Sequence, residues 1–144
     1  MWFFEDSFSP MTKVAIRSGS ERRTAPLRVL VVEDELLIAL LLEEYLVSIG
    51  CEVVGIARDS ASACRLVDQE HPDLALLDIN LANGTSAPVA RRLAEQGRPF
   101  IFVTAYDDLD NLPKDLRESK VIQKPVDPAR LRTMVDQAAS QNRN

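Results

Sequence analysis

The chain has 144 residues, a formal net charge of −5 and average proportions of apolar and charged residues. This length is enough for one domain with a substantial core. The acidic balance and the lack of long Lys/Arg runs argue against a nucleic-acid-binding surface. The longest apolar run is too short to cross a bilayer, and the apolar start is cut off by acidic residues, so we expect no membrane span or secretory signal. The two cysteines match no metal-ligand spacing, and a cytoplasmic protein fits this pattern.

Composition divides the chain into three parts. Residues 1–25 show no period, and Ser, Arg, Gly and Thr crowd their second half, so we expect a poorly ordered leader there. Met11 is an alternative start of the protein. A compact domain is expected over residues 26–140, followed by a short tail over residues 141–144.

Within the domain, short β-branched or apolar runs alternate with segments of helical period. Continuous apolar runs of this length are typical of buried parallel strands. Strands are expected over residues 27–32, 51–57, 73–77, 99–103 and 119–122, and helices over residues 35–49, 59–70, 86–96 and 127–140.

Capping residues mark the ends of the expected helices. Asp59 and Ser86 are placed to cap the second and third helices. Gly50 ends the first helix, and Asp127 with Pro128 starts the last one. These signals support the boundaries that the apolar periods indicate.

The stretch 106–118 has weaker helical signals than the rest. It carries three leucines, but Asn111 and Pro113 interrupt it, so we expect a short or irregular fourth helix. The alternation as a whole predicts a doubly wound α/β fold of the (βα)5 type, with a parallel sheet covered by helices on both faces.

Four polar signals follow apolar runs: Glu33 with Asp34, then Asp78 and Thr104 directly after theirs, and Lys124 one residue beyond the run Val121-Ile122. If the runs are parallel strands, all four signals lie at the carboxyl edge of one sheet. Open α/β sheets build their ligand sites at that edge. The sequence therefore predicts one site with three carboxylates, a hydroxyl and an ammonium.

These side chains suit a divalent metal and a phosphoryl group. Asp34 and Asp78 offer the hard oxygen ligands that Mg²⁺ prefers, and Glu33 adds a third negative charge. Like charges about 5 Å apart repel by roughly 3 kcal/mol at an effective dielectric of about 20, which a cation relieves. A carboxylate can attack phosphorus, while Lys124 and Thr104 stabilise the phosphoryl oxygens. Taken singly, the acidic residues also suit a helix N-terminus.

This set of residues resembles a response-regulator receiver domain of bacterial two-component signalling, over residues 27–140. The matching residues are the acidic pair Glu33-Asp34, Asp78, Thr104 followed by a small residue, and Lys124 followed by proline. The resemblance implies a flavodoxin-like sheet with strand order 2-1-3-4-5. It also implies that a histidine kinase phosphorylates Asp78.

The resemblance assigns a role to each matching residue. Asp34, Asp78 and the backbone carbonyl of Asn80 would hold Mg²⁺, with Glu33 beside them. Lys124 would contact the phosphoryl group, and Thr104 would close on it. Asp78, Thr104 and Lys124 are therefore the expected catalytic set of a protein that is otherwise no enzyme.

A narrower resemblance covers residues 99–106. This stretch is similar to the Pro-Phe-x-Phe-Ala-Thr-Gly-Tyr stretch of FATGUY receivers, which are often stand-alone domains served by HWE-type histidine kinases. Val103 and Ala105 replace the Ala and Gly of that stretch.

The switch residues depart from the general family. Most receivers carry Tyr or Phe three residues before the strand-five lysine, where this chain has Val121. The usual aromatic swing behind the threonine is then not available. We expect the switch to run through Thr104, Ala105 and Tyr106 instead.

Two further features bear on partners. His71, the single histidine, precedes a proline at a helix end and is expected to be a loop residue, which argues against a phosphocarrier role. The first helix is more apolar than packing on a sheet requires. Its extra face suits a partner or a weak homodimer, or it packs against the leader. The expected packing positions are Ile38, Leu41, Leu42, Tyr45 and Ile49, and the extra face comprises Leu36, Leu40 and Val47.

The leading hypothesis is a single-domain response regulator in the cytoplasm. It would signal by phosphorylation-dependent binding of a protein not yet known, or by phosphoryl shuttling, with slow autodephosphorylation. The alternative is a receiver-like interaction module that is not phosphorylated. A hydrolase with a nucleophilic Asp would want a carboxylate two residues after Asp78, where Asn80 stands. A flavin-binding protein would need a Ser/Thr/Gly-rich loop at residues 33–35, which are acidic.

Overall fold

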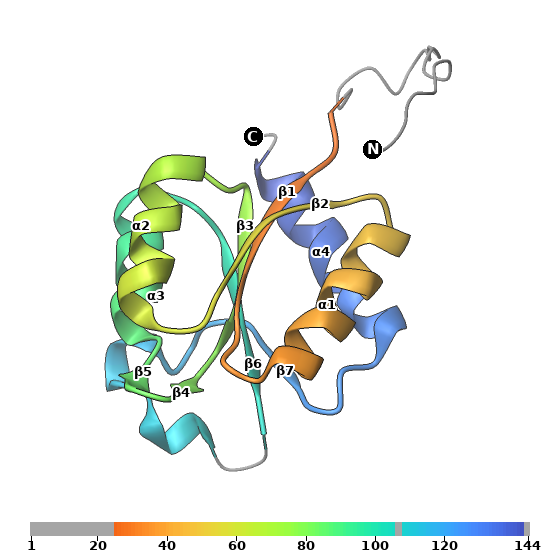
Figure 1. Cartoon of the computed structure of the whole chain (residues 1–144). Helices are drawn as coiled ribbons and strands as arrows, with labels where there is room; N and C mark the ends of the chain where they lie inside the picture. The colour runs from red at the N-terminus through yellow and green to blue at the C-terminus, as the bar shows by residue number, and fades with distance from the viewer. Residues whose placement is uncertain (1–24, 106–107, 143–144) are drawn as a thin grey trace, which may run out of the picture.

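A computed structural model describes residues 25–105 and 108–142 (Figure 1). Of the leader predicted over residues 1–25, only Ala25 lies within these ranges. Of the tail predicted over residues 141–144, only Gln141 and Asn142 do, and they end the last helix. Within the described part of the chain, no helix has the length and apolar character needed to cross a membrane.

The fold is a five-stranded parallel sheet with helices on both faces (Figure 1). The spatial strand order is β2-β1-β3-β6-β7, which is the predicted order 2-1-3-4-5 once the strands of this sheet are counted along the chain. The strands are β1 (Arg28–Val32), β2 (Glu52–Ala57), β3 (Leu74–Asp78), β6 (Phe100–Thr104) and β7 (Val121–Gln123), and the helices are α1 (Leu36–Ser48), α2 (Ser60–Glu70), α3 (Ala87–Glu95) and α4 (Pro128–Asn142).

The strand register brings the predicted site residues to one edge. Val32 of β1 pairs with Leu77 of β3, so Glu33 and Asp78, which follow them, lie at the same level of the sheet. Asp78 pairs with Val103, the residue before Thr104. Thr104 in turn pairs with Gln123, the residue before Lys124. Because all pairs are parallel, the carboxyl ends of β1, β3, β6 and β7 meet at one edge.

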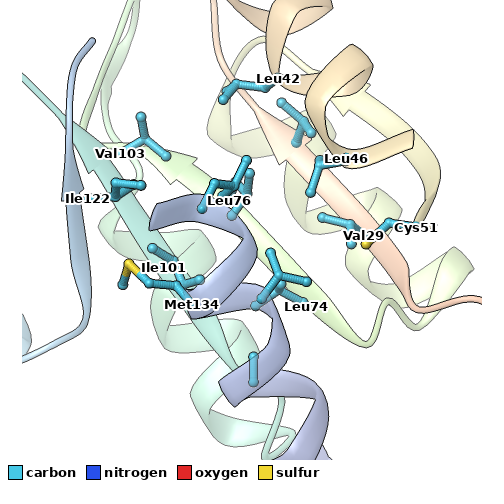
Figure 2. Packing of buried hydrophobic residues seen from close by; sticks show 14 of the residues in the cluster. Val29, Leu42, Leu46, Cys51, Leu74, Leu76, Ile101, Val103, Ile122 and Met134 are labelled. Atoms are coloured by element: carbon cyan, nitrogen blue, oxygen red, sulfur yellow. The ribbon is translucent and has the colours of Figure 1, made fainter. Parts of the chain in front are cut away.

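Alternation along the buried strands fills two cores. Val29 and Val31 of β1 point to the face covered by α1 and α4, where Leu76 and Met134 also pack (Figure 2). Leu30 and Val32 of β1 point to the opposite face of the sheet, which α2 and α3 cover. Both faces are covered, which explains why β1, β3 and β6 are apolar along most of their length.

Residues 108–116 form two short 3₁₀ turns, η2 (Asp108–Asn111) and η3 (Lys114–Leu116), in place of a fourth regular helix. The prediction of an irregular segment is confirmed. Leu112 and Leu116 are buried in the α2–α3 core, whereas Leu109 is 40% exposed. Two leucines therefore anchor a segment that has little regular hydrogen bonding of its own.

The helix caps follow the predictions with one exception. The Asp59 carboxylate accepts a hydrogen bond from the Ser62 backbone N–H at 2.8 Å, as an N-cap should. Ser86 occupies the N-cap position of α3, but its side chain makes no capping bond. The hydroxyl of Thr85 accepts from the Ala87 N–H at 3.3 Å instead. The predicted N-cap position of Ser86 is therefore confirmed, but the capping bond expected from its side chain is absent.

The packing face of α1 is also rotated from the prediction. Ala39 and Leu46 are fully buried together with Leu42, while Leu41 is 45% exposed. The assignment of Leu41 to the sheet-facing side is wrong, whereas the exposure of Leu36 and Leu40 agrees with the prediction. The helix is apolar on nearly every side, so its period alone does not fix which side faces the sheet.

Candidate functional site

Three carboxylates meet at the carboxyl edge of the sheet. Glu33 and Asp34 follow β1, and Asp78 ends β3. One oxygen atom from each of the three side chains lies within 4.8 Å of the others. Glu33 is 1% exposed and Asp78 is 6% exposed, so two of the three carboxylates are buried.

Lys124 supplies the positive charge of this site. Its backbone N–H donates to the Thr104 carbonyl at 2.8 Å, which holds the residue directly after β7 against the end of β6. Its ammonium nitrogen Nζ lies 3.2 Å from Glu33 Oε1 and 3.4 Å from Asp78 Oδ1. The peptide bond from Lys124 to Pro125 is cis. The second oxygen of Glu33 accepts from the Glu35 backbone N–H at 3.1 Å.

The electrostatics of the site are set by burial and by like charge. Burial and the neighbouring Glu33 carboxylate raise the pKa of Asp78 from 3.8 to about 7, although the Lys124 ammonium opposes the shift. Burial lowers the pKa of Lys124, but the carboxylates of Asp78 and Glu33 outweigh burial and hold that pKa above its usual value. The site is therefore short of positive charge.

The donor set fits a divalent cation with hard ligands. Three carboxylates face one ammonium, which leaves a net negative charge at the edge of the sheet. The buried Glu33 Oε1 has no well-aligned hydrogen-bond donor within the described ranges, and the Lys124 ammonium balances it only in part. Mg²⁺ usually takes one or two carboxylates from a protein and keeps several waters, and this cluster can supply those carboxylates.

Thr104 lies at the same edge but does not contact the carboxylates through any hydrogen bond seen in the described residues. It is 1% exposed, and its hydroxyl donates to the Ala105 carbonyl at 2.9 Å. Ala105 is exposed. The prediction that Tyr106 acts in the switch falls on a residue outside the described ranges.

Asn80 links the site to the 3₁₀ segment. The residue begins β4 (Asn80–Leu81), which pairs with β5 (Gly84–Thr85) in a short antiparallel ribbon. The side-chain oxygen of Asn80 accepts a hydrogen bond from the Asn111 amide at 3.2 Å. Sequence reasoning missed this link, because two asparagines that lie 31 positions apart carry no pattern.

His71 is not part of the site. It ends α2 in the left-handed backbone conformation, with φ +50°, just before β3 begins. It therefore lies at the amino edge of the sheet, away from Asp78. This position agrees with its predicted loop character.

The doubly wound fold and the acidic edge define a receiver-type α/β domain. Residues 29–136 match the family of response regulator receiver domains, and the chain belongs to this family. This finding confirms the family that the sequence motifs indicate. The subgroup with the FATGUY stretch stays a prediction.

Relatives of this chain carry the names of regulators. The Phyllosphere-induced regulator PhyR of Methylorubrum extorquens is 34% identical over 113 residues, which cover 76% of this chain and 42% of that protein. The transcriptional regulatory protein PdtaR of Mycobacterium tuberculosis is 31% identical, covering 82% of this chain and 59% of that protein. The chain thus spans about half the length of the curated relatives that it matches.

Solved structures show the same fold. SdrG from Sphingomonas melonis Fr1 superposes with a TM-score of 0.70 at 34% identity, covering 79% of this chain and 97% of that one. The receiver domain of PhyR from Erythrobacter litoralis gives a TM-score of 0.70 at 34% identity, covering 80% of this chain and 91% of that one. Each of these matches covers about four fifths of this chain.

Proposed function

We propose that this protein accepts a phosphoryl group on Asp78 from the phosphohistidine of a histidine kinase. The observation that carries the proposal is the contact of the Lys124 ammonium with both Asp78 and Glu33, at 3.4 and 3.2 Å. An ammonium in this place neutralises a carboxylate that must approach an anionic phosphoryl group. Members of the receiver family accept phosphoryl groups in this way, and the chain belongs to that family.

The transfer is a single displacement at phosphorus. A carboxylate oxygen of Asp78 forms the new O–P bond while the N–P bond of the phosphohistidine breaks, and the released imidazole nitrogen takes a proton from solvent. Lys124 stays close enough to Asp78 to pair with a phosphoryl oxygen after transfer. The product is an acyl phosphate, which water hydrolyses slowly to return the Asp78 carboxylate.

Asp34, Asp78 and the backbone carbonyl of Asn80 would hold Mg²⁺, with Glu33 completing the negative charge around it. When bound, the ion supplies charge stabilisation for the oxygens of the phosphoryl group. The residues of the chain position the nucleophile and keep its carboxylate facing the edge of the sheet.

Thr104 is the proposed switch residue. Its hydroxyl donates to the Ala105 carbonyl, so a phosphoryl oxygen that attracts this hydroxyl would compete with that bond. The displacement would pass to Ala105 and Tyr106 and from there to the 3₁₀ segment. Val121 replaces the usual aromatic residue, which leaves this route as the available one.

We further propose that the protein acts in the cytoplasm as a single-domain response regulator of a two-component system. Its output would be phosphorylation-dependent protein binding or phosphoryl shuttling between kinases, and an HWE-type kinase would be its donor. Relatives named for anti-anti-sigma activity, such as PhyR from Bartonella quintana, support an output by protein contact. A weak homodimer is compatible with the exposed side of α1.

The test is phosphorylation by a small phosphodonor in the presence of Mg²⁺, followed by intact-mass measurement. We expect one added phosphoryl group, none in the Asp78→Asn variant and none with excess chelator. Asp73→Asn is the matched control, because Asp73 directly precedes β3 at the edge of the sheet opposite Asp78 and should leave the yield unchanged. An unchanged yield in Asp78→Asn would place the phosphoryl group on another residue and contradict the proposal. No added group in the unmodified protein would favour the alternative, an interaction module that is not phosphorylated.

A further inference from the structure

One outer edge of the sheet is formed by β7. It pairs with β6 on one side, and no other strand in the described part of the chain pairs with it. The Lys120 carbonyl accepts from β6 at 2.9 Å, and the Lys124 N–H donates to β6 at 2.8 Å. Because backbone groups alternate in direction along a strand, the N–H and C=O groups of Val121 and Gln123 point outward. An open edge of this kind is a template for another strand, whereas β2, the other outer strand, carries an irregularity in its register that disfavours pairing.

A hollow of about 580 Å³ lies between this edge and α4. Lys120 and Val121 line it from β7, and Met134 and Gln137 line it from α4. Val121 and Met134 contribute apolar surface, and Gln137 adds a polar group at the side. Alternate side chains of a strand added to β7 point toward α4, so they lie in this hollow. The edge therefore offers both backbone groups and side-chain room to a further strand.

The hollow is basic in a chain that is acidic overall. Lys120 and Arg130 are exposed and line it, whereas the chain has a net charge of −5. Neither side chain forms an ion pair with a residue that the structure describes. Asp127 also lines the hollow, but its carboxylate accepts from the Ala129 N–H at 3.1 Å and so caps the start of α4. The charge of this surface therefore favours an acidic ligand.

We propose that β7 takes up an extended, acidic segment of a partner protein as a further strand of the sheet. The outward N–H and C=O groups of Val121 and Gln123 bind the backbone of that segment. Its apolar side chains face Met134, and its acidic side chains lie near Lys120 and Arg130. Binding at this edge uses none of the residues of the acidic site, so the proposal stands independently of phosphoryl transfer.

A second copy of the chain fits this edge less well. Antiparallel pairing of two β7 strands centred on Ile122 places Lys120 of each copy opposite Lys124 of the other. Like charges directly opposite each other destabilise a strand pair, and an edge lysine is a common means of preventing such self-pairing. An acidic strand from another protein meets no such repulsion.

The test measures how a short, fluorescently labelled peptide of alternating valine and glutamate binds to the full-length protein. The anisotropy of the peptide should rise and saturate as protein is added. Hydrogen exchange of the Val121 and Gln123 amides should slow by about fivefold or more, because both become hydrogen-bonded. The Ile122 amide already faces β6 and should change little. A lack of saturable binding, or unchanged exchange at both outward amides, would overturn the proposal.

Replacement of Gln123 separates strand pairing from other contacts. Proline has no N–H, so Gln123→Pro removes an outward donor without removing a bond to β6. Peptide binding should weaken by about fivefold, as for one lost main-chain hydrogen bond. The matched control is Gln123→Thr, which keeps the N–H and suits a strand, and it should bind like the unmodified protein. Unchanged binding by Gln123→Pro, with a fold shown by circular dichroism to be intact, would contradict strand pairing.

Charge reversal tests the acidic character of the partner, even where the proline variant does not fold. Both Lys120 and Arg130 are exposed, so Lys120→Glu combined with Arg130→Glu should leave the fold intact. The unmodified protein should prefer the valine–glutamate peptide to a valine–lysine peptide by about tenfold, and the double variant should reverse this preference. Equal binding of both peptides to both proteins would overturn the proposal. Dimers in sedimentation experiments, with both outward amides protected before peptide is added, would assign the edge to a second copy and overturn it too.

Discussion

The acidic site and the 3₁₀ segment are joined by the hydrogen bond between Asn80 and Asn111, yet they are built in opposite ways. Asp78 ends β3, which pairs with a parallel strand on each side. Lys124 follows β7, and its backbone N–H donates to the Thr104 carbonyl at the end of β6. Residues 108–116 have only two short turns and depend on buried leucines. A rigid site thus adjoins a segment that can rearrange at low cost, which is the combination that a switch requires.

The largest expected effect tests how firmly the 3₁₀ segment is anchored. Leu112 is 2% exposed in the core under α3, so Leu112→Ala should lower the free energy of unfolding by about 2–4 kcal/mol. Leu109→Ala, at a half-exposed position, should change it by less than about 0.5 kcal/mol. Urea unfolding measures both. Equal effects of the two replacements would show that the segment has no preferred anchor.

A second prediction concerns the pH dependence of stability without metal. The folded protein holds the Asp78 proton up to about pH 7, whereas the unfolded chain loses it near 3.8. Between these values the folded state binds more protons, so stability falls as the pH rises. Asp78→Asn cannot ionise and should be more stable than the unmodified protein by about 1–3 kcal/mol near pH 8, with no gain near pH 4.

Asp115 gives the control for this pH dependence, because its pKa is shifted the other way. A hydrogen bond from Arg91 lowers the pKa of Asp115, which lies in η3. Its stabilising contribution is present at neutral pH and is lost as the pH falls through the lowered pKa. Asp115→Asn should therefore not gain stability near pH 8. Thermal melts across this pH range compare the two variants, and a gain in both would contradict the special position of Asp78.

A third prediction separates metal binding from structural support. Asp34→Ala removes one of three crowded negative charges, so stability without metal should stay within about 1 kcal/mol or rise. The stabilisation that added Mg²⁺ gives should become smaller. Thermal melts with and without Mg²⁺ measure both quantities. A marked loss of stability without metal would show that Asp34 mainly supports the start of α1.

The smallest expected effect is the response of the 3₁₀ segment to a phosphoryl mimic. Hydrogen exchange should change most within residues 104–118, by about fivefold, which corresponds to about 1 kcal/mol in local opening. Amides near Lys124 should change less. Tyr106→Ala should leave phosphorylation of Asp78 largely intact but reduce the change. Exchange differences concentrated in α1 would show that the signal leaves through Leu36 and Leu40 instead.

The sequence was informative where a physical rule connects distant residues. Asp78, Thr104 and Lys124 each end an apolar run, and parallel pairing necessarily brings such positions to one edge. The short ribbon of β4 and β5 was not predicted, because strands of two residues have no period. The hydrogen bond of Asn80 with Asn111 depends on the path of an irregular loop, which no local pattern encodes.

Local rules failed where neighbouring residues compete for the same role. Ser86 takes the N-cap position of α3, but the hydroxyl that accepts from the helix is that of the preceding Thr85. Leu41 and Leu46 are equally apolar, and only the docking angle of α1 decides which of them is buried. In both cases the sequence narrows the choice to a few similar residues, and tertiary packing decides among them.

Helix α4 follows Lys124 at the acidic edge and runs back along the sheet (Figure 1). Its later residues Val135 and Ala139 line the same surface hollow as Ala25. Both ends of the described domain therefore lie at the edge opposite Asp78. A chip or bead attached at the carboxyl end of α4 would hold the molecule with the edge that carries Asp78 turned away from the surface. Surface-immobilised protein should then remain open to a phosphodonor as large as a kinase, which makes it a practical bait for capturing one.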